Sequence, residues 1–159
     1  MANPKDKVYS RPMSSIEAFR FDQSVADVFQ DMIERSVPGY GLVLQLIGVL
    51  AEKYGQPGTQ AYDLGCSLGA STLQLRRHLP DGCHVVGVDN SEAMVSRCTA
   101  NLSRDHSAAS YEILLEDLRE TTIENASIVI PNFTLQFVPD EERKNILTRI
   151  CEGLNVGGI

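Results

Sequence analysis

A loop with two glycines follows the first predicted strand and is the segment of this sequence best suited to hold a ligand. It spans residues 63–69 (D-L-G-C-S-L-G) and joins a strand predicted at 59–64 to a helix predicted to end at His78. Gly65 and Gly69 permit a tight turn without a Cβ that would obstruct a ligand, and the helix N-terminus offers backbone N–H groups. The loop predicts a site for a nucleotide-like molecule, although a purely structural strand-to-helix turn would use the same glycines.

The spacing of the glycines distinguishes two kinds of nucleotide site. The dinucleotide fingerprint G-x-G-x-x-G, read from Gly65, requires glycines where this chain has Ser67 and Ala70. A second form places an acidic residue two positions before G-x-G-x-G. Asp63, Gly65 and Gly69 match that form, and Ser67 replaces its middle glycine. The pattern therefore favours an adenosyl ligand over NAD.

Two polar residues lie at the end of the second predicted strand, at 84–89. Asp89 lies 20 residues after Gly69, where a carboxylate can accept hydrogen bonds from both hydroxyls of a ribose. Asn90 is next to it and could reach the adenosine as well. Taken alone, Asp89 could instead cap the helix that follows.

The ends of the next two predicted strands supply further candidates. Asp117 and the backbone N–H of Leu118 together form the acceptor and donor that an adenine edge requires, although a solvated acidic turn is an equal alternative. Asn132 follows the fourth strand, where it could hydrogen-bond the amino-acid part of a ligand. Phe133 and Phe137, close behind it, are expected in the core.

These segments belong to an α/β protein, because apolar strands alternate with amphipathic helices. We expect a Rossmann-like, doubly wound, mostly parallel sheet, in which ligands bind beyond the carboxyl ends of the strands. An arm at 1–21 precedes a partial ligand-binding domain at 22–159, with Asp22 or Ser24 capping the first helix. The predicted helices are 22–36, 40–54, 70–78, 91–103 and 139–154, and the strands are 59–64, 84–89, 111–115 and 127–133.

Composition narrows the classes of partner. The 159 residues include 14 basic and 21 acidic side chains, a net charge of −7, and no cluster of lysine or arginine. A nucleic-acid-binding face or an anionic membrane surface is therefore not expected, whereas small molecules are. No apolar run approaches the roughly 20 residues of a membrane span. The four cysteines lack zinc-ligand spacing, so we expect free thiols, no metal site and a soluble, cytoplasmic protein.

The four strand-end elements, in this order, resemble the class I S-adenosyl-L-methionine (SAM)-dependent methyltransferases over residues 40–159. Four stretches carry a closer resemblance, to the bacterial carboxy-S-adenosyl-L-methionine (carboxy-SAM) synthase family, in which serine at the place of the middle glycine is the usual residue. They are 29–40 (FQDMIERSVPGY), 62–70 (YDLGCSLGA), 124–127 (ENAS) and 132–137 (NFTLQF).

The resemblance implies a transferase that converts SAM and prephenate to carboxy-SAM and phenylpyruvate. A partner enzyme then uses carboxy-SAM to modify the wobble uridine of certain tRNAs. The synthase itself handles small molecules and is expected to be a homodimer, with the apolar helix at 40–54 available to pack between subunits. Carried over residue by residue, the expected cofactor contacts are Tyr40, Gly65, Cys66, Ser67, Asp89, Asn90, Asp117, Leu118 and Asn132.

The resemblance assigns no general base to this chain, so its catalytic residues stay unassigned. Residues 154–159 are expected to lead into a further strand, which makes the chain the N-terminal part of a longer protein. The family's carboxylate-binding arginine would lie beyond Ile159, and the prephenate pocket would also draw on residues there. An ordinary SAM-dependent methyltransferase and a non-catalytic SAM-binding module remain alternatives.

Overall fold

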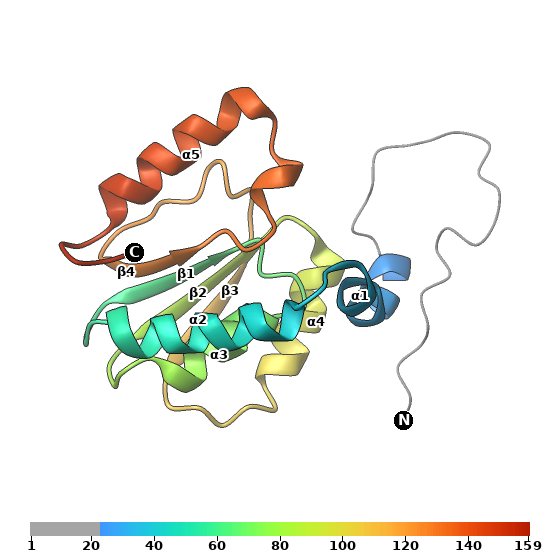
Figure 1. Cartoon of the computed structure of the whole chain (residues 1–159), viewed down its shortest axis with the longest axis horizontal. Coiled ribbons are helices and arrows are strands. Elements are labelled where there is room, and N and C mark those ends of the chain that lie inside the picture. Colours follow the sequence, from blue (N-terminus) through green and yellow to red (C-terminus); the bar gives the residue numbers. More distant parts are fainter. Residues whose placement is uncertain (1–22) are drawn as a thin grey trace.

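The computed structural model describes residues 23–159, which form an α/β domain with one four-stranded sheet (Figure 1). The strands run parallel in the order β3-β2-β1-β4. The elements are α1 (Gln23–Ser36), α2 (Tyr40–Tyr54), β1 (Gln60–Leu64), α3 (Ala70–His78), β2 (His84–Asp89), α4 (Glu92–Leu102), β3 (Ser110–Leu115), β4 (Ala126–Ile130), the 3₁₀-helix η1 (Leu135–Phe137) and α5 (Asp140–Gly153).

Helices cover both faces of the sheet, as the strand–helix alternation predicts. α2, α3 and α4 lie on one face and α5 lies on the other (Figure 1). Successive strand residues point to opposite faces, so Val85 packs with Ile47 of α2 and Leu75 of α3. The next residue, Val86, packs with Ile146 of α5. Burial on both faces explains the continuous apolar run of β2, residues 85–88.

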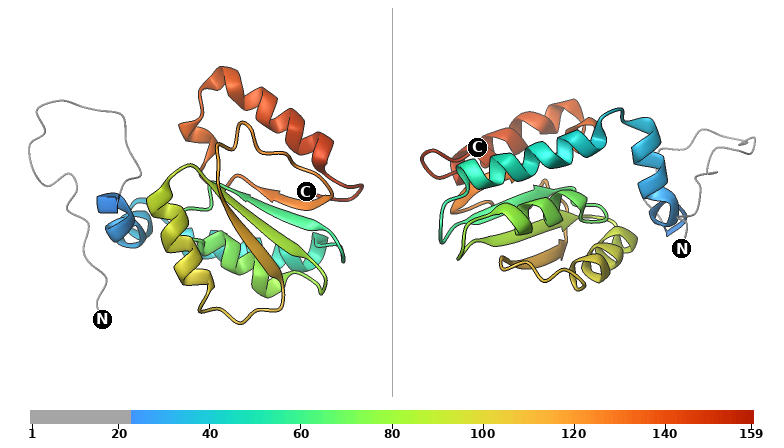
Figure 2. Two further views of the ribbon diagram at one scale, coloured as in Figure 1. Left: turned by 180° about the vertical axis from the view of Figure 1, so that it is seen from behind. Right: turned by 60° about the horizontal axis from the view of Figure 1, so that its bottom comes forward.

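α1 stands at the edge of the sheet where the strands have their carboxyl ends (Figure 2). Its buried residues Val25 and Ala26 pack against Met94 of α4, and Phe29 and Leu68 join the same cluster. α1 thereby contacts the glycine loop predicted to bind a ligand, at residues 65–69. The predicted arm at 1–21 and the candidate cap Asp22 lie outside the described residues. Ser24 lies inside α1, so its assignment as an N-cap was wrong.

The predicted fourth strand, at 127–133, extends too far. β4 ends at Ile130 because Pro131 has no N–H to continue the ladder, and its carbonyl accepts a turn hydrogen bond from the Thr134 N–H at 3.3 Å. Phe133, within this turn, has a φ of +57°, which no strand residue adopts. The turn places residues 131–134 at the carboxyl ends of the strands.

The segment after α5 returns to the edge of β4 that β1 does not pair with. Leu154 forms a parallel bridge with Ala126. The Ile159 N–H donates to the Ser127 carbonyl at 3.0 Å, and the Ile159 carbonyl accepts from the Val129 N–H at 2.8 Å. Separately, none of the helices within residues 23–159 has the length and apolar character that crossing a membrane requires.

Candidate functional site

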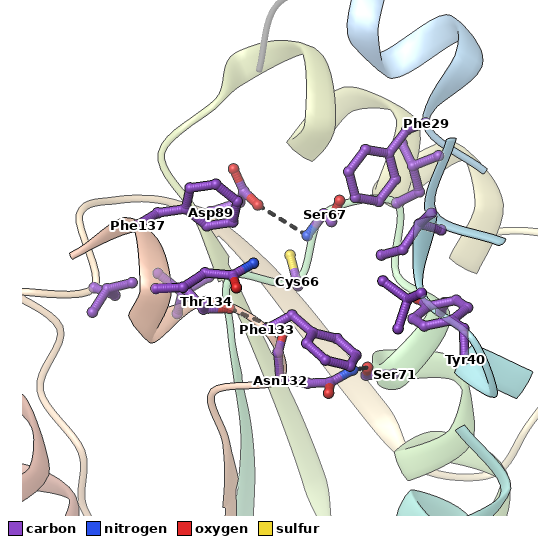
Figure 3. Close-up of a pocket in the computed structure, with 18 of the residues that line it drawn as sticks. Phe29, Tyr40, Cys66, Ser67, Ser71, Asp89, Asn132, Phe133, Thr134 and Phe137 are labelled. Carbon is purple, nitrogen blue, oxygen red and sulfur yellow. Dashed lines mark hydrogen bonds between the residues drawn. The ribbon is translucent and has the colours of Figure 1, made fainter. Parts of the chain in front are cut away.

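A cavity of about 1230 Å³ opens at the carboxyl ends of the strands, between α1, the glycine loop and the segment after β4 (Figure 3). Loops at this edge come from every strand, because parallel strands end there together. All nine residues predicted from the sequence line this cavity: Tyr40, Gly65, Cys66, Ser67, Asp89, Asn90, Asp117, Leu118 and Asn132. The structure therefore brings together positions separated by more than ninety residues in the chain, into one place where a ligand could contact them all.

The glycine loop is fixed by contacts that depend on its glycines. Gly65 has a φ of +84°, and a Cβ at this position would lie 2.3 Å from Thr134 Oγ1. The N–H groups of Gly65 and Cys66 both donate to the Val88 carbonyl of β2. The loop is thus held against β2 on one side and against the segment after β4 on the other. Ser67, in place of a glycine, also has a positive φ, of +53°.

Asp89 is anchored by backbone donors from both of its neighbouring segments. Its Oδ2 accepts from the Ser67 N–H and its Oδ1 accepts from the Ser91 N–H, each at 2.9 Å. Ser91 is itself the N-cap of α4, accepting from the Met94 N–H. Burial raises the pKa of Asp89, while the two N–H donors oppose that rise. Each carboxylate oxygen keeps a further lone pair, so Asp89 can still accept from a ligand hydroxyl.

Asp63 lies buried beneath the glycine loop rather than in the cavity wall. It is 1% exposed and accepts a 2.6 Å hydrogen bond from the Thr72 hydroxyl. Burial raises the pKa of Asp63 to about 7; the hydrogen bonds from the Thr72 hydroxyl and N–H oppose this rise, and the charge of Asp89 adds to it. Within residues 23–159, neither Asp63 nor Asp89 forms an ion pair with a basic side chain. The cavity wall at Asp89 therefore has a carboxylate without a basic partner, which suits a cationic ligand.

Asp117, on the β3 side of the cavity, has a basic partner. The Arg119 guanidinium donates to both carboxylate oxygens of Asp117, at 3.0 Å from Nε to each and 2.5 Å from Nη2 to Oδ2. These hydrogen bonds hold the pKa of Asp117 below its usual range. Asp117 is thus an oriented, ionised acceptor, and the N–H of neighbouring Leu118 lies beside it in the chain.

Asn132 ties the segment after β4 to the start of α3. Its side-chain Nδ2 donates to Ser71 Oγ at 3.3 Å, and its backbone carbonyl accepts from Thr134 Oγ1 at 3.2 Å (Figure 3). Ser71 and Thr134 also line the cavity, and the sequence did not single them out. Their role depends on packing between loops, which no local pattern in the sequence reveals.

Aromatic rings from α2 and from the segment after β4 form part of the cavity wall. The rings of Tyr40 and Phe133 have centroids 6.4 Å apart and are tilted by 40°. Burial, together with the charges of Asp63 and Glu34, raises the pKa of Tyr40 to about 12, so its hydroxyl remains a neutral donor. Phe133 is 38% exposed and Phe137 is 56% exposed. Their assignment to the core was wrong, because the turn at 131–134 directs this segment to the cavity.

Cys66 faces the cavity but is a poor nucleophile. The neighbouring Cys98 thiol and burial both raise the pKa of the Cys66 thiol, which keeps it protonated. All four cysteines, Cys66, Cys83, Cys98 and Cys151, are free, as expected. Cys66 therefore acts as a small wall residue.

Comparison with known proteins identifies the kind of domain that carries this site. A family model described as "Methyltransferase domain" matches residues 61–158. The chain is 49% identical over 158 residues to a carboxy-S-adenosyl-L-methionine synthase of Vibrio cholerae serotype O1, covering 99% of this chain and 64% of the relative. It is also 49% identical to the carboxy-S-adenosyl-L-methionine synthase of Aliivibrio salmonicida, covering 66% of that protein. The chain thus spans about two thirds of the length of these relatives.

Solved structures resemble the fold at low sequence identity. The mitomycin 7-O-methyltransferase MmcR has a TM-score of 0.61 and 17% identity, covering 86% of this chain and 37% of that one. The cyclopropane synthase MmaA2 of Mycobacterium tuberculosis has a TM-score of 0.60 and 16% identity, covering 72% and 38%. These likenesses show the class I methyltransferase fold expected from the sequence. The family match over residues 61–158 establishes that this chain belongs to the methyltransferase-domain family.

Proposed function

We propose that this chain is the cofactor-binding part of a carboxy-SAM synthase, which converts SAM and prephenate to carboxy-SAM and phenylpyruvate. The observation that carries the proposal is the gathering of all nine expected contact residues around one cavity, and one of them, Asp89, has no basic partner within residues 23–159. The sulfonium and ammonium groups of SAM supply the positive charge that is missing beside Asp89. The names and 49% identity of the relatives support the choice of this activity.

The residues present fit SAM along the whole cavity. Asp89 would accept from the ribose hydroxyls, and Asp117 with the Leu118 N–H would meet the adenine edge. At the other end of the cavity, Asn132 and the neutral hydroxyl of Tyr40 are the polar groups that would bind the methionyl part of SAM. When bound, SAM supplies an electron-poor methyl group on a positively charged sulfur. The chain's own residues bind and orient that group and exclude water from it.

A second substrate has room beside the cofactor. The cavity volume of about 1230 Å³ exceeds the roughly 300–1,000 Å³ typical of a pocket for one small molecule. In the proposed reaction prephenate loses carbon dioxide and its ring hydroxyl group. The carbon dioxide becomes the new carboxyl group, and the hydroxyl leaves as water with a proton from the methyl group. No base from this chain is needed, which agrees with the neutral Tyr40 and protonated Cys66.

The first test is mass spectrometry of the small molecule released when the purified chain is denatured, joined to calorimetric titration with SAM. We expect carboxy-SAM, or SAM binding that Asp89→Ala weakens by about tenfold or more through loss of the ribose acceptor. Asp81→Ala, on an exposed loop residue outside the cavity, is the matched control. Retention of SAM alone would favour an ordinary methyltransferase, and failure of the chain to bind either molecule would refute the proposal.

The proposal includes a cytoplasmic homodimer that does not itself contact tRNA. The net charge of −7 supports the absence of a nucleic-acid face. α2 exposes an apolar stripe, in which Leu42, Leu46 and Val49 are 61%, 51% and 56% exposed, and a two-fold interface would bury this stripe against its copy. Sedimentation equilibrium should give a dimer that Leu46→Glu dissociates. A monomeric wild-type chain would rule this interface out.

A further inference from the structure

Phe133 is held in a backbone conformation that favours glycine, although it carries a large side chain. Its φ of +57° lies in the left-handed region, where a bulky residue is a clear outlier. Its ring is nevertheless 38% exposed and lines the cavity, so hydrophobic burial does not account for this conformation. Strain of this kind persists only where surrounding contacts impose it, and it concentrates at functional sites.

The contacts that impose this conformation come from both neighbours of Phe133 in the chain. On one side Asn132 is tied to Ser71 at the start of α3. On the other side Thr134 packs so closely on Gly65 that no Cβ could fit there. With residues 132 and 134 both fixed against the glycine loop and α3, the residue between them turns its ring into the cavity, toward Tyr40 (Figure 3).

The order of the strands indicates which part of a bound SAM molecule reaches Phe133. Asp117 follows β3, Asp89 ends β2, the glycine loop follows β1 and Phe133 follows β4. The sheet order is β3-β2-β1-β4. A ligand with its adenine at Asp117 and its ribose at Asp89 must extend across the end of β1. Its next group, the sulfur, is therefore directed toward the end of β4, where Phe133 and Tyr40 stand.

We propose that the Phe133 ring, paired with the Tyr40 ring, contacts the positively charged sulfur of SAM and makes the site select the sulfonium over the neutral sulfide. This inference rests on the function proposed above. An aromatic face attracts a cation through its quadrupole. The aromatic face also has no lone pair that could accept the methyl group. A site that holds a reactive sulfonium requires neighbours that cannot take that group. Asp89 adds general attraction for cations, and the ring adds contact at one atom.

The test compares two ligands that differ in charge at the sulfur, SAM and S-adenosylhomocysteine. Their dissociation constants are measured by calorimetric titration at one pH and ionic strength, for the wild-type chain and for four variants. Phe133→Leu keeps apolar bulk but removes the aromatic face. Phe133→Asn also removes the face and suits a positive φ, so it protects the experiment against a folding defect. Phe133→Tyr keeps the ring, and Phe137→Leu removes a different exposed ring from the same cavity.

We expect both ring-deleting variants of Phe133 to lower the preference for SAM over S-adenosylhomocysteine by about fivefold, the size of one partly desolvated cation–π contact. Phe133→Tyr should keep the wild-type preference, and Phe137→Leu should change both affinities by the same factor. Equal losses for the two ligands in Phe133→Leu and Phe133→Asn would overturn the inference while leaving SAM binding intact. A wild-type chain that binds neither ligand would overturn the proposed function, and this inference with it.

Discussion

Replacing Asp63 with asparagine should stabilise the protein at neutral pH and remove a large part of its pH dependence. Burial raises the pKa of this carboxyl from 3.8 to about 7. Between these two pH values the folded chain therefore retains a proton that the unfolded chain has lost. The unfolding free energy must then fall as pH rises from about 4 to about 7. Over these three pH units, at about 1.4 kcal/mol per unit, the ionisation of Asp63 lowers the unfolding free energy by at most about 4 kcal/mol.

Asparagine reproduces the shape of the protonated side chain without its titration. Its carbonyl oxygen can accept the hydrogen bond that the Thr72 hydroxyl gives to Asp63. We therefore expect Asp63→Asn and the wild type to have similar unfolding free energies at pH 4. At pH 8 the variant should be more stable, by at most about 4 kcal/mol.

The assay is urea-induced unfolding followed by circular dichroism at half-unit steps from pH 4 to pH 8. Asp81→Asn, at an exposed loop position, controls for the loss of one acidic residue and should follow the wild-type curve. Parallel curves for wild type and Asp63→Asn across this range would refute the reasoning, because they would show that Asp63 ionises in the folded state at its ordinary pKa. A less stable variant at pH 8 would refute it as well.

Three further predictions concern the same site and its support. SAM binding near pH 6.5 should release protons, because a cation above Asp63 lowers the raised pKa of that carboxyl. Calorimetric titration in buffers of different ionisation enthalpy should detect this release in the wild type but not in Asp63→Asn. Gly65→Ala should cost about 2–4 kcal/mol of unfolding free energy, because a Cβ would meet Thr134, whereas Gly58→Ala, with a φ of +77° and open space around it, should cost about 1 kcal/mol. Arg76→Met should lower the unfolding free energy by about 3 kcal/mol, because Arg76 is 6% exposed and donates to three backbone carbonyls. The same urea denaturation measures this loss, and a loss below about 1 kcal/mol would contradict the prediction.

The sequence predicted the elements whose signals are local. β2 was placed at 84–89 by a run of apolar residues that both faces of the sheet bury, and Ser91 was identified as the cap of α4. Gly55 was expected to end α2, and its N–H does donate to the Ala51 carbonyl there. The positions of the nine candidate contacts followed from the rule that loops at the carboxyl ends of parallel strands converge. Their roles toward a ligand stay predictions.

The sequence was less informative where distant segments decide the local structure. The stretch at 127–133 reads as one apolar strand, but Pro131 and the packing of Thr134 on Gly65 turn its last residues aside. Phe133 therefore looked like a core residue and is a cavity residue. The raised pKa of Asp63 was missed for the same reason, because it depends on burial, on the Thr72 hydrogen bond and on the charge of Asp89, which is 26 positions away in the chain.

The close packing of Thr134 on Gly65 has a consequence for how the chain acquires its function. β1 pairs with β4 across more than sixty intervening residues, and pairings between distant segments are slow to form. The cavity wall at 132–134 exists only once that pairing is complete, so a chain that has paired β2 with β1 and β3 but not yet β1 with β4 still lacks this wall of its pocket. A ligand that needs the whole pocket binds only the finished fold, and it thereby shifts the folding equilibrium toward it. Newly made chains would gain stability from their cofactor at the last step of sheet assembly.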